Sequence, residues 1–339
     1  MSADVPGLDA ARVQQYFERH VAGCDGPIEI RLLLGGRSNL TYAVTDGERS
    51  WVLRRPPMGL VAPSANDVGR EYRYLAALRD TDVPVPATVA LCTDLEVTGA
   101  PFSVVTMVDG DVVRTTEDGA RLGPAAADHG RHLVTTLATL HQVDPEAVGL
   151  AAGGAPGYSS RQVARWRDQW EIVRTQELPD LDRLHAALAS DVPAASRAAV
   201  VHGDYRIDNV LFRPDGSGEV AAVIDWEMAT VGDPLADLGL LLAYWNPACA
   251  PLLADLHPIS ANAAFPTPDE LVATYERAAD VEVARLPFFV ALGHFKLAVI
   301  AEGIHHRFLD GDTVGDGFDR AGAAVAPLVA AGLGVLAGA

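Results

Sequence analysis

Two apolar, strand-forming runs in the middle of the chain each end directly on polar side chains. The run that ends at Val201 is followed by H-G-D-Y-R-I-D-N, which carries Asp204 and Asn209, and Glu219–Ile224 is followed by Asp225. The turn-forming stretch R-P-D-G-S-G predicts a β-hairpin that brings Asn209 and Asp225 to the same end. Because acidic and amide groups at strand ends contribute little to folding, this pattern indicates a site that holds something charged.

The residue types at these strand ends favour phosphoryl transfer. Single amide and carboxylate oxygens suit Mg²⁺, which keeps several waters and takes its other ligands from phosphates. Asp204 has no obvious basic partner in the sequence, so it is free to accept a proton from a hydroxyl nucleophile. A catalytic Asp followed by an Asn and a second Asp on the metal is the arrangement used in phosphoryl transfer. The competing interpretation is a pair of ordinary loop carboxylates with an Asx-turn.

The same segments resemble a known family, the aminoglycoside phosphotransferase / choline kinase-like branch of the protein-kinase fold. H-G-D-Y-R-I-D-N matches its H-G-D-x-x-x-x-N loop, I-D-W-E its metal-binding segment, and G-D-P-L-A-D-L its G-D-P-x-x-D-L segment. Further matches are L-G-G-R-S-N-L-T-Y, W-V-L-R-R, R-E-Y-R-Y-L, P-F-S-V-V-T-M and K-L-A-V-I-A-E-G-I-H-H-R. The resemblance covers most of the chain. Several segments look most like the kinase-like domain associated with acyl-CoA dehydrogenases.

The resemblance implies a role for each residue of the central motifs. Asp204 would be the catalytic base, and Asn209 and Asp225 would bind Mg²⁺. Asp237 would anchor the catalytic loop from the next helix, although it also fits an ordinary first-turn carboxylate of that helix. His202 lies in the turn between strand and loop, and the base role already has a candidate, so we expect His202 to support the loop structurally.

The resemblance also implies a nucleotide site in the first part of the chain, for ATP with GTP not excluded. A glycine turn would cover the phosphates with its backbone N–H groups. A cation on the third strand would pair with a carboxylate on the next helix, as in kinases. The residues concerned are Gly35, Gly36, Ser38, Asn39, Arg54, Glu71 and Met107. Taken singly, the glycines also fit an ordinary hairpin turn and Glu71 an ordinary surface charge.

Two positions depart from the protein-kinase pattern. Arg54 stands where kinases have Lys, and its planar guanidinium binds phosphate or carboxylate in a bidentate manner. Strand alternation lets only one of Arg54 and Arg55 face the nucleotide, and the register favours Arg54. Trp226 and Glu227 replace the Phe-Gly of regulated protein kinases, so we expect no flipping activation loop.

The acceptor is the open part of the expected function. The resemblance favours a small-molecule hydroxyl, such as that of a hydroxyacyl-CoA or similar metabolite. The alternatives are an aminoglycoside or antibiotic acceptor and a nucleotide-binding module without turnover. A protein kinase is disfavoured because D-F-G and A-P-E are missing. Lys296, Glu302 and Arg307 are candidate substrate residues, although they also fit an ordinary helix face.

The charge balance argues against nucleic-acid and membrane partners. The formal net charge of −19, with 45 acidic and 26 basic residues, opposes binding to phosphate backbones and anionic lipids. We expect no membrane-spanning segment, because Arg, Glu or Asp interrupts the apolar runs. The three cysteines form no C-x-x-C pattern and no signal peptide is evident, so a reducing cytoplasm is expected.

Periodicity predicts an α+β protein with a β-rich part followed by a mainly helical part, and the resemblance implies that these are the two lobes of a protein-kinase-like fold. Residues 1–108 are expected to form a small antiparallel β-lobe with one inserted helix, and residues 109–339 a mainly helical lobe. The expected strands are Ile28–Leu34, Leu40–Val44, Trp51–Arg54, Val89–Leu91 and Phe102–Met107. The expected helices are Asp9–His20, Asn66–Leu78, His129–Leu140, Arg161–Thr175, Pro234–Tyr244, Pro268–Ala279, Leu286–Phe308 and a helical tail from Ala321.

Overall fold

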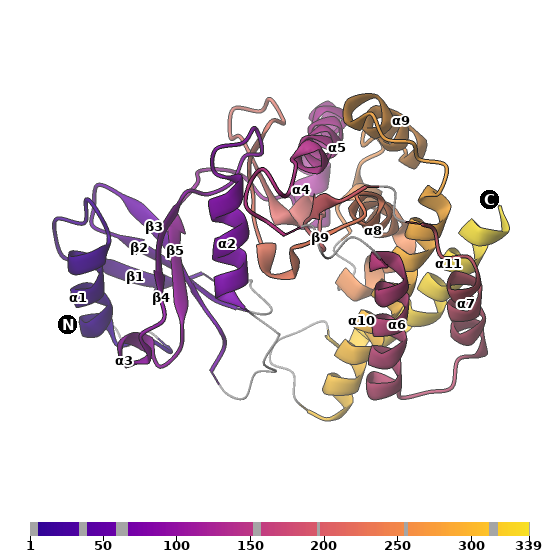
Figure 1. The fold of residues 1–339 in the computed structure, drawn as a ribbon, viewed down its shortest axis with the longest axis horizontal. Helices are drawn as coiled ribbons and strands as arrows, with labels where there is room; N and C mark the ends of the chain where they lie inside the picture. The colour runs from indigo at the N-terminus through magenta and orange to yellow at the C-terminus, as the bar shows by residue number, and fades with distance from the viewer. Residues whose placement is uncertain are drawn as a thin grey trace. The chain divides into compact units, whose positions relative to one another are not determined.

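The computed structural model describes residues 6–33, 39–58, 67–151, 157–194, 197–253, 257–311 and 318–338. The chain forms two compact units (Figure 1). The first contains residues 1–109 and 221–229, and the second contains residues 110–220 and 230–339. The sequence-based division placed 221–229, which carries Asp225, with the helical part of the chain. The structure groups this segment with the β-sheet unit instead.

The first unit is built on a five-stranded sheet in the order β1-β2-β3-β5-β4, with antiparallel neighbours. Its strands are β1 (Glu29–Leu32), β2 (Leu40–Thr45), β3 (Ser50–Arg55), β4 (Thr88–Cys92) and β5 (Phe102–Thr106). Its helices are α1 (Ala10–His20), α2 (Val68–Leu78) and α3 (Leu95–Thr98).

Strand alternation gives the two faces of this sheet different partners. Tyr42, Leu53 and Val104 are neighbours in register, and they share a buried cluster with Val13 and Phe17 of α1. Helix α2 packs against β4 and β5, and Figure 1 shows the sheet lying between α1 and α2. Residues next to Leu53 therefore point toward α2, which decides where the arginines of β3 lie.

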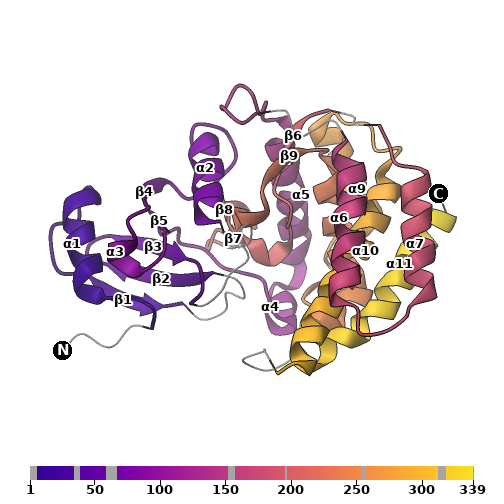
Figure 2. The same ribbon diagram turned by 60° about the horizontal axis from the view of Figure 1, so that its bottom comes forward.

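The second unit is mainly helical. Its helices are α4 (Thr116–Arg121), α5 (Ala126–Gln142), α6 (Tyr158–Val173), α7 (Pro179–Ser190), α8 (Leu235–Trp245), α9 (Pro268–Ala279), α10 (Leu286–Leu309) and α11 (Val325–Ala337). Figure 2 shows α6, α7, α10 and α11 side by side, and α10 contacts each of the other three. Short strands β6 (Ala199–Val201) and β9 (Thr230–Gly232) pair antiparallel.

The predicted hairpin is present. Strands β7 (Val210–Phe212) and β8 (Val220–Val223) pair, and the Arg213 N–H donates to the Glu219 carbonyl at 2.8 Å across the turn. The start predicted for α9 is also confirmed, because Thr267 caps it in a capping box and Pro268 is its first residue. The fold class expected from the sequence is confirmed in both units.

Two glycines allow α8 and α10 to cross closely. A Cβ built on Gly239 of α8 would lie 2.4 Å from the carbonyl carbon of Phe289. A Cβ on Gly293 of α10 would lie 2.9 Å from the Gly239 carbonyl oxygen. Only glycine fits at such a backbone contact. The crossing fixes α10 against the helix that follows the catalytic motifs.

The prediction that charges interrupt every apolar run is wrong for the C-terminal segment, which has no charged residue after Arg320. Leu286–Leu309 and Phe318–Ala337 are long and apolar enough to cross a membrane. The first is 72% buried over its most apolar window, as expected for a core helix, and the second is 33% buried. Helices in the cores of soluble proteins have the same length and composition, so this is weak evidence for a membrane span.

Candidate functional site

The loop after β6 holds the Asp204 carboxylate in one orientation. Gly203 has φ +83°, a left-handed conformation that turns the chain sharply before Asp204. The Tyr244 hydroxyl donates to Asp204 Oδ1 at 3.1 Å, and the Asn209 amide donates to Oδ2 at 3.1 Å. The same amide donates to the Asp204 backbone carbonyl at 2.8 Å. Both carboxylate oxygens are therefore oriented by neutral donors.

Arg206 also lies beside this carboxylate. Its Nε is 3.6 Å from Asp204 Oδ2, its Nη2 is 3.0 Å from Asp208 Oδ2, and its guanidinium lies 5.0 Å from the Tyr244 ring centroid. The prediction that Asp204 lacks a basic partner is therefore wrong, because Arg206 lies within ion-pair distance of it. Burial raises the pKa of Asp208, and Arg206 offsets part of that effect. Arg206 is thus shared between two carboxylates.

Asp237, in the first turn of α8, binds the loop backbone, which is the place that the resemblance implied for it. It is fully buried and accepts from the His202 N–H at 2.6 Å and the Gly203 N–H at 2.8 Å. His141 Nε2 lies 3.3 Å from the same carboxylate, and His141 Nδ1 is 2.7 Å from the Tyr275 hydroxyl. Burial alone would raise the pKa of Asp237, but the histidines and backbone donors outweigh it and hold that pKa below its usual value.

His202 itself is fully buried and supports the loop. Its Nδ1 accepts from the Asp204 N–H at 3.2 Å, and its ring packs edge-on against Tyr205 at 5.8 Å between centroids. This is the structural placement expected for His202.

The three candidate substrate residues on α10 lie in different surroundings. Lys296 Nζ donates to the Gly203 carbonyl at 2.5 Å. Glu302 is fully buried and accepts from the Thr175 N–H at 2.6 Å and the Thr175 hydroxyl at 2.8 Å, so its carboxylate holds the end of α6. Arg307 is exposed.

In the first unit, Arg54 joins β3 to α2 and to Asp225. It forms an ion pair with Glu71 and donates to Asp225 Oδ1 at 2.9 Å. Burial by itself lowers the pKa of Arg54, but Glu71 and Asp225 outweigh it and raise that pKa. Burial raises the pKa of Glu71, which Arg54 partly offsets. The expected pairing of Arg54 with Glu71 is present.

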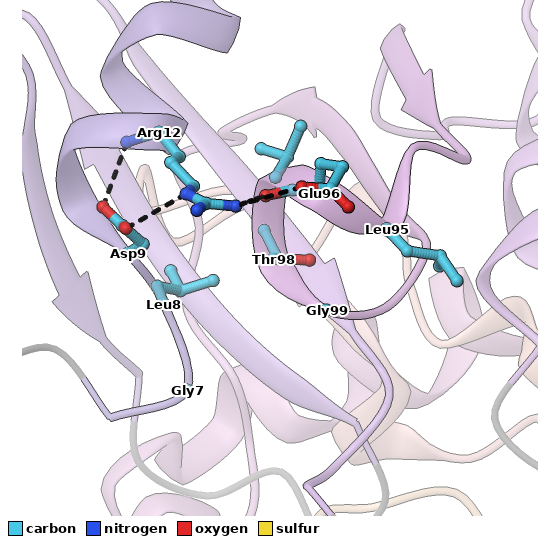
Figure 3. A pocket seen from close by; sticks show the side chains of 9 residues that line it. Gly7, Leu8, Asp9, Arg12, Leu95, Glu96, Thr98 and Gly99 are labelled. Atoms are coloured by element: carbon cyan, nitrogen blue, oxygen red, sulfur yellow. Dashed lines mark hydrogen bonds and ion pairs between the residues drawn. The ribbon is translucent and has the colours of Figure 1, made fainter.

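Arg55 points to the opposite face of the sheet. It donates to the carbonyls of Gly7 and Thr98, at the edge of a hollow of about 300 Å³ between α1 and α3 (Figure 3). Within that hollow Arg12 already pairs with Asp9 at 3.3 Å, and Glu96 lies beside it at 3.7 Å. None of the residues predicted for the site lines this hollow.

Of the remaining candidates for the nucleotide site, the structure describes two, Asn39 and Met107. Gly35, Gly36 and Ser38 lie outside the described residues. Asn39 is buried, and its amide donates to the Glu227 carboxylate at 2.9 Å. Met107 is 37% exposed at the end of β5.

The donor types fit a hard divalent cation. Asp225 has φ +69°, which is uncommon outside glycine and is typical of residues constrained by function. Asn209 belongs to the second unit and Asp225 to the first, so their meeting at one ion stays a prediction. Among the described residues no group of three or more His, Cys, Asp or Glu forms a ready metal cage. A Mg²⁺ ion here would need phosphate and water ligands, which is its usual coordination.

Sequence reasoning missed several residues around the loop. Tyr244 and Tyr275 gave no signal, because their partners lie 40 and 134 residues away in the chain. His141 ends a recognisable helix pattern but has no motif of its own. Glu227 was visible as the last residue of I-D-W-E, and its contact with Asn39 was not anticipated.

Comparison with known proteins decides the family. The pattern of the phosphotransferase enzyme family (APH) matches residues 29–279, which include every motif described above except the C-terminal one. The chain belongs to the phosphotransferase enzyme family. Two relatives match beyond these residues: acyl-CoA dehydrogenase family member 11 of Gallus gallus is 33% identical over 97% of this chain. Family member 10 of Mus musculus is 33% identical over 88% of it. The chain spans 44% and 29% of these two relatives, respectively.

Solved phosphotransferase structures share the fold. A protein from Ralstonia eutropha, named provisionally as an aminoglycoside phosphotransferase, superposes with a TM-score of 0.83 at 29% identity, covering 98% of this chain and 99% of its own. A thermostable mutant of APH(4)-Ia in complex with AMP-PNP and hygromycin B has a TM-score of 0.63 at 18% identity, covering 97% of this chain and all of its own. The antiparallel sheet and the helical unit are thus those of the protein-kinase-like phosphotransferases.

Proposed function

We propose that this chain is a small-molecule kinase that transfers the γ-phosphoryl group of a Mg²⁺-bound nucleotide to a hydroxyl group. The observation that carries the proposal is the Asp204 carboxylate, oriented by Tyr244 and Asn209 on a loop whose backbone is anchored by Asp237. A family whose members are phosphotransferases supports the same reaction class. An oriented carboxylate of this kind is suited to receive the proton of the attacking hydroxyl.

In this proposal each unit contributes a separate part. Asp204 orients and deprotonates the acceptor hydroxyl. Arg54, fixed by Glu71, steadies the nucleotide phosphates with its fork of N–H donors. Asn209 and Asp225 would hold Mg²⁺, which supplies charge neutralisation on the phosphates when bound. Most of the rate acceleration would come from positioning and charge, with the base contributing about 10²–10⁴-fold.

The acceptor we favour is an anionic metabolite with a free hydroxyl, such as a hydroxyacyl-CoA. Lys296 lies close enough to Asp204, Arg165 and Arg206 for their charges to influence its pKa. Arg165, Arg206 and Lys296 supply positive charge near the base, partly offset by Asp204, Asp208 and Asp237. Positive charge at this place would favour an anionic acceptor over a polycationic one. The names of the relatives, which are acyl-CoA dehydrogenase family members, support the same class.

An aminoglycoside acceptor is the second candidate. One structural neighbour is bound to hygromycin B, and the acidic net charge of −19 would attract a cationic antibiotic to the surface. The cations beside Asp204 weigh against it. A nucleotide-binding module without turnover is the third, and the presence of Asp204, Asn209 and Asp225 weighs against that.

Ligand-induced thermal stabilisation separates these candidates. The protein would be heated with Mg²⁺-ATP, Mg²⁺-GTP, hydroxyacyl-CoAs, aminoglycosides, choline and sugars, each with and without Mg²⁺. A ligand at about a hundred times its Kd stabilises the folded state by about 2.7 kcal/mol, which is readily detected. We expect a Mg²⁺-dependent shift with nucleotide and a shift with hydroxyacyl-CoA. No nucleotide shift at saturation would contradict the kinase proposal, and a shift with aminoglycosides alone would replace the favoured acceptor.

A further inference from the structure

The peptide bond between Gly203 and Asp204 is held by hydrogen bonds at both of its polar atoms. The Asp204 N–H donates to His202 Nδ1 at 3.2 Å. The Gly203 carbonyl accepts from Lys296 Nζ at 2.5 Å. This is the peptide that leads directly into the proposed base, so its orientation sets the direction in which the Asp204 side chain leaves the backbone.

Lys296 reaches this carbonyl from a separate helix in the same unit. Its helix, α10, is fixed against α8 by the close crossing at Gly239 and Gly293. The ammonium also lies 5.4 Å from the ring centroid of Trp166 on α6, a favourable cation–π distance. The site is therefore built from three elements, and Lys296 donates to the loop backbone from outside the loop.

The charges around Lys296 come from each of the elements that face it. Asp204 of the loop and Asp237 of α8 are acidic, and Arg165 of α6 and Arg206 of the loop are basic. Desolvation lowers the pKa of Lys296, and the two carboxylates offset part of the effect. A lysine in such surroundings is costly to the fold unless it has a defined hydrogen-bond partner, and the Gly203 carbonyl is that partner.

We propose that Lys296 is a positioning residue, which holds the Gly203–Asp204 peptide so that the Asp204 carboxylate faces the acceptor hydroxyl. This role rests on the proposed function and differs from the substrate contact expected for Lys296 from the sequence. A substrate-binding lysine would present its ammonium to the ligand, whereas this ammonium donates to a backbone carbonyl of the catalytic loop. A displacement of about 1 Å at a reacting group can cost about 100-fold in rate, so a backbone clamp at this place has a large effect.

The test uses two variants of Lys296 and one control on the same helix. Lys296→Met removes the donor and the charge and keeps most of the side-chain length. Lys296→Arg keeps a donor. Phe295→Leu is the control, because Phe295 is fully buried beside His185 of α7 and its loss lowers stability without removing a bond to the loop.

We expect Lys296→Met to lower kcat about 10- to 100-fold with the KM values for nucleotide and acceptor within about twofold. Lys296→Arg should recover most of the loss, and Phe295→Leu should keep kcat. A rise in the acceptor KM with unchanged kcat would overturn the proposal in favour of a substrate contact. An unchanged kcat and KM in Lys296→Met would overturn it as well.

Amide hydrogen exchange separates this proposal from the proposed function. Exchange of peptides covering residues 200–210 needs no substrate. We expect it to be at least about tenfold faster in Lys296→Met than in the wild-type protein and in Phe295→Leu, because the loop loses one of its anchors. Unchanged exchange would overturn the clamp even if the enzyme is active. Faster exchange in a protein that transfers no phosphate would support the clamp and contradict the kinase.

Discussion

At the scale of single residues, the base is oriented before any ligand binds. Asp204 receives one hydrogen bond on each carboxylate oxygen, from Tyr244 and Asn209. Burial and the neighbouring Asp204 raise the pKa of Tyr244 well above its usual value, so Tyr244 stays a neutral donor at any physiological pH. Preorganised groups of this kind avoid reorganisation during the reaction. Tyr244 should therefore contribute to turnover through the direction of the carboxylate.

Tyr244→Phe tests that contribution. The ring that Arg206 stacks on is kept and only the hydroxyl is lost. A hydrogen bond to a charged group contributes about 1.5–3 kcal/mol, and 1.36 kcal/mol corresponds to tenfold in rate. We expect kcat to fall by about tenfold or more with nucleotide affinity unchanged, measured by steady-state kinetics. Tyr42→Phe is the matched control, since its hydroxyl bonds to the Pro6 carbonyl in the other unit. Equal kinetics for the two variants would contradict the role of Tyr244.

At the scale of elements, one ion pair ties α2 to the sheet. Arg54 and Glu71 have only 14% and 5% of their side-chain surface exposed, and they join β3 to α2. Removing one partner of a buried pair leaves an uncompensated charge and costs about 3–5 kcal/mol. The same cation contacts Asp225, so the pair also connects the proposed metal ligand to the nucleotide residues.

Arg54→Met should both destabilise the first unit and weaken Mg²⁺-nucleotide binding. Without Arg54, burial keeps the folded-state pKa of Glu71 above its unfolded value. Stability is then greatest below the unfolded pKa and is lost as the pH rises through the folded pKa. We expect denaturant unfolding to show a larger deficit relative to the wild type at about pH 8 than at about pH 5. In Arg54→Met/Glu71→Gln the deficit should shrink and lose its pH dependence, while nucleotide binding stays weak. A pH-independent deficit in the single variant would contradict this account.

The close crossing of α8 and α10 can be tested by adding a methyl group at Gly239. Gly239→Ala would place a Cβ 2.4 Å from the Phe289 backbone and should lower the unfolding free energy by about 1–3 kcal/mol. Gly334→Ala in α11 is the matched control, because no atom beyond the adjacent residues and backbone of its own helix lies within 4 Å of the added Cβ. It should be neutral or stabilise by up to about 1 kcal/mol through helix propensity. Urea unfolding compares the two, and equal stabilities would show that the crossing tolerates a side chain.

At the scale of the whole molecule, the sequence predicted the elements that have a local pattern of their own, namely most strands and helices and the loop around Asp204. The five strands of the sheet and the main helices follow from alternation, helical spacing and turn residues, with ends shifted by one to three residues in most cases. The motifs around Asp204 predicted the loop, and the family resemblance implied its anchor at Asp237. Helix α7 was missed, although Pro179 and three buried leucines at helical spacing could have indicated it. Strand β9 has three residues, too few for a period to be visible.

The features that the sequence did not predict depend on contacts between residues far apart in the chain, which leave no local pattern. Lys296 meets Gly203 across 93 residues, and Tyr244 meets Asp204 across 40. Both meetings follow from the packing of α8 and α10, which depends on glycines that look ordinary in the sequence. Likewise, the grouping of residues 221–229 with the sheet unit depends on tertiary contacts, since a strand and turn of this kind could belong to either unit.

The most direct test of the kinase proposal is phosphoryl transfer itself. Wild-type protein and Asp204→Asn would be incubated with Mg²⁺-ATP and a hydroxyacyl-CoA, and the acceptor would be analysed by mass spectrometry. The account predicts that, with wild-type protein, the acceptor gains one phosphate group only in the presence of Mg²⁺. Asp204→Asn should bind nucleotide normally and lose about 10²–10⁴-fold in rate. The kinase proposal would be contradicted if the two proteins transferred phosphate equally. It would also be contradicted if a wild-type protein that binds Mg²⁺-ATP transferred phosphate to no hydroxyl acceptor.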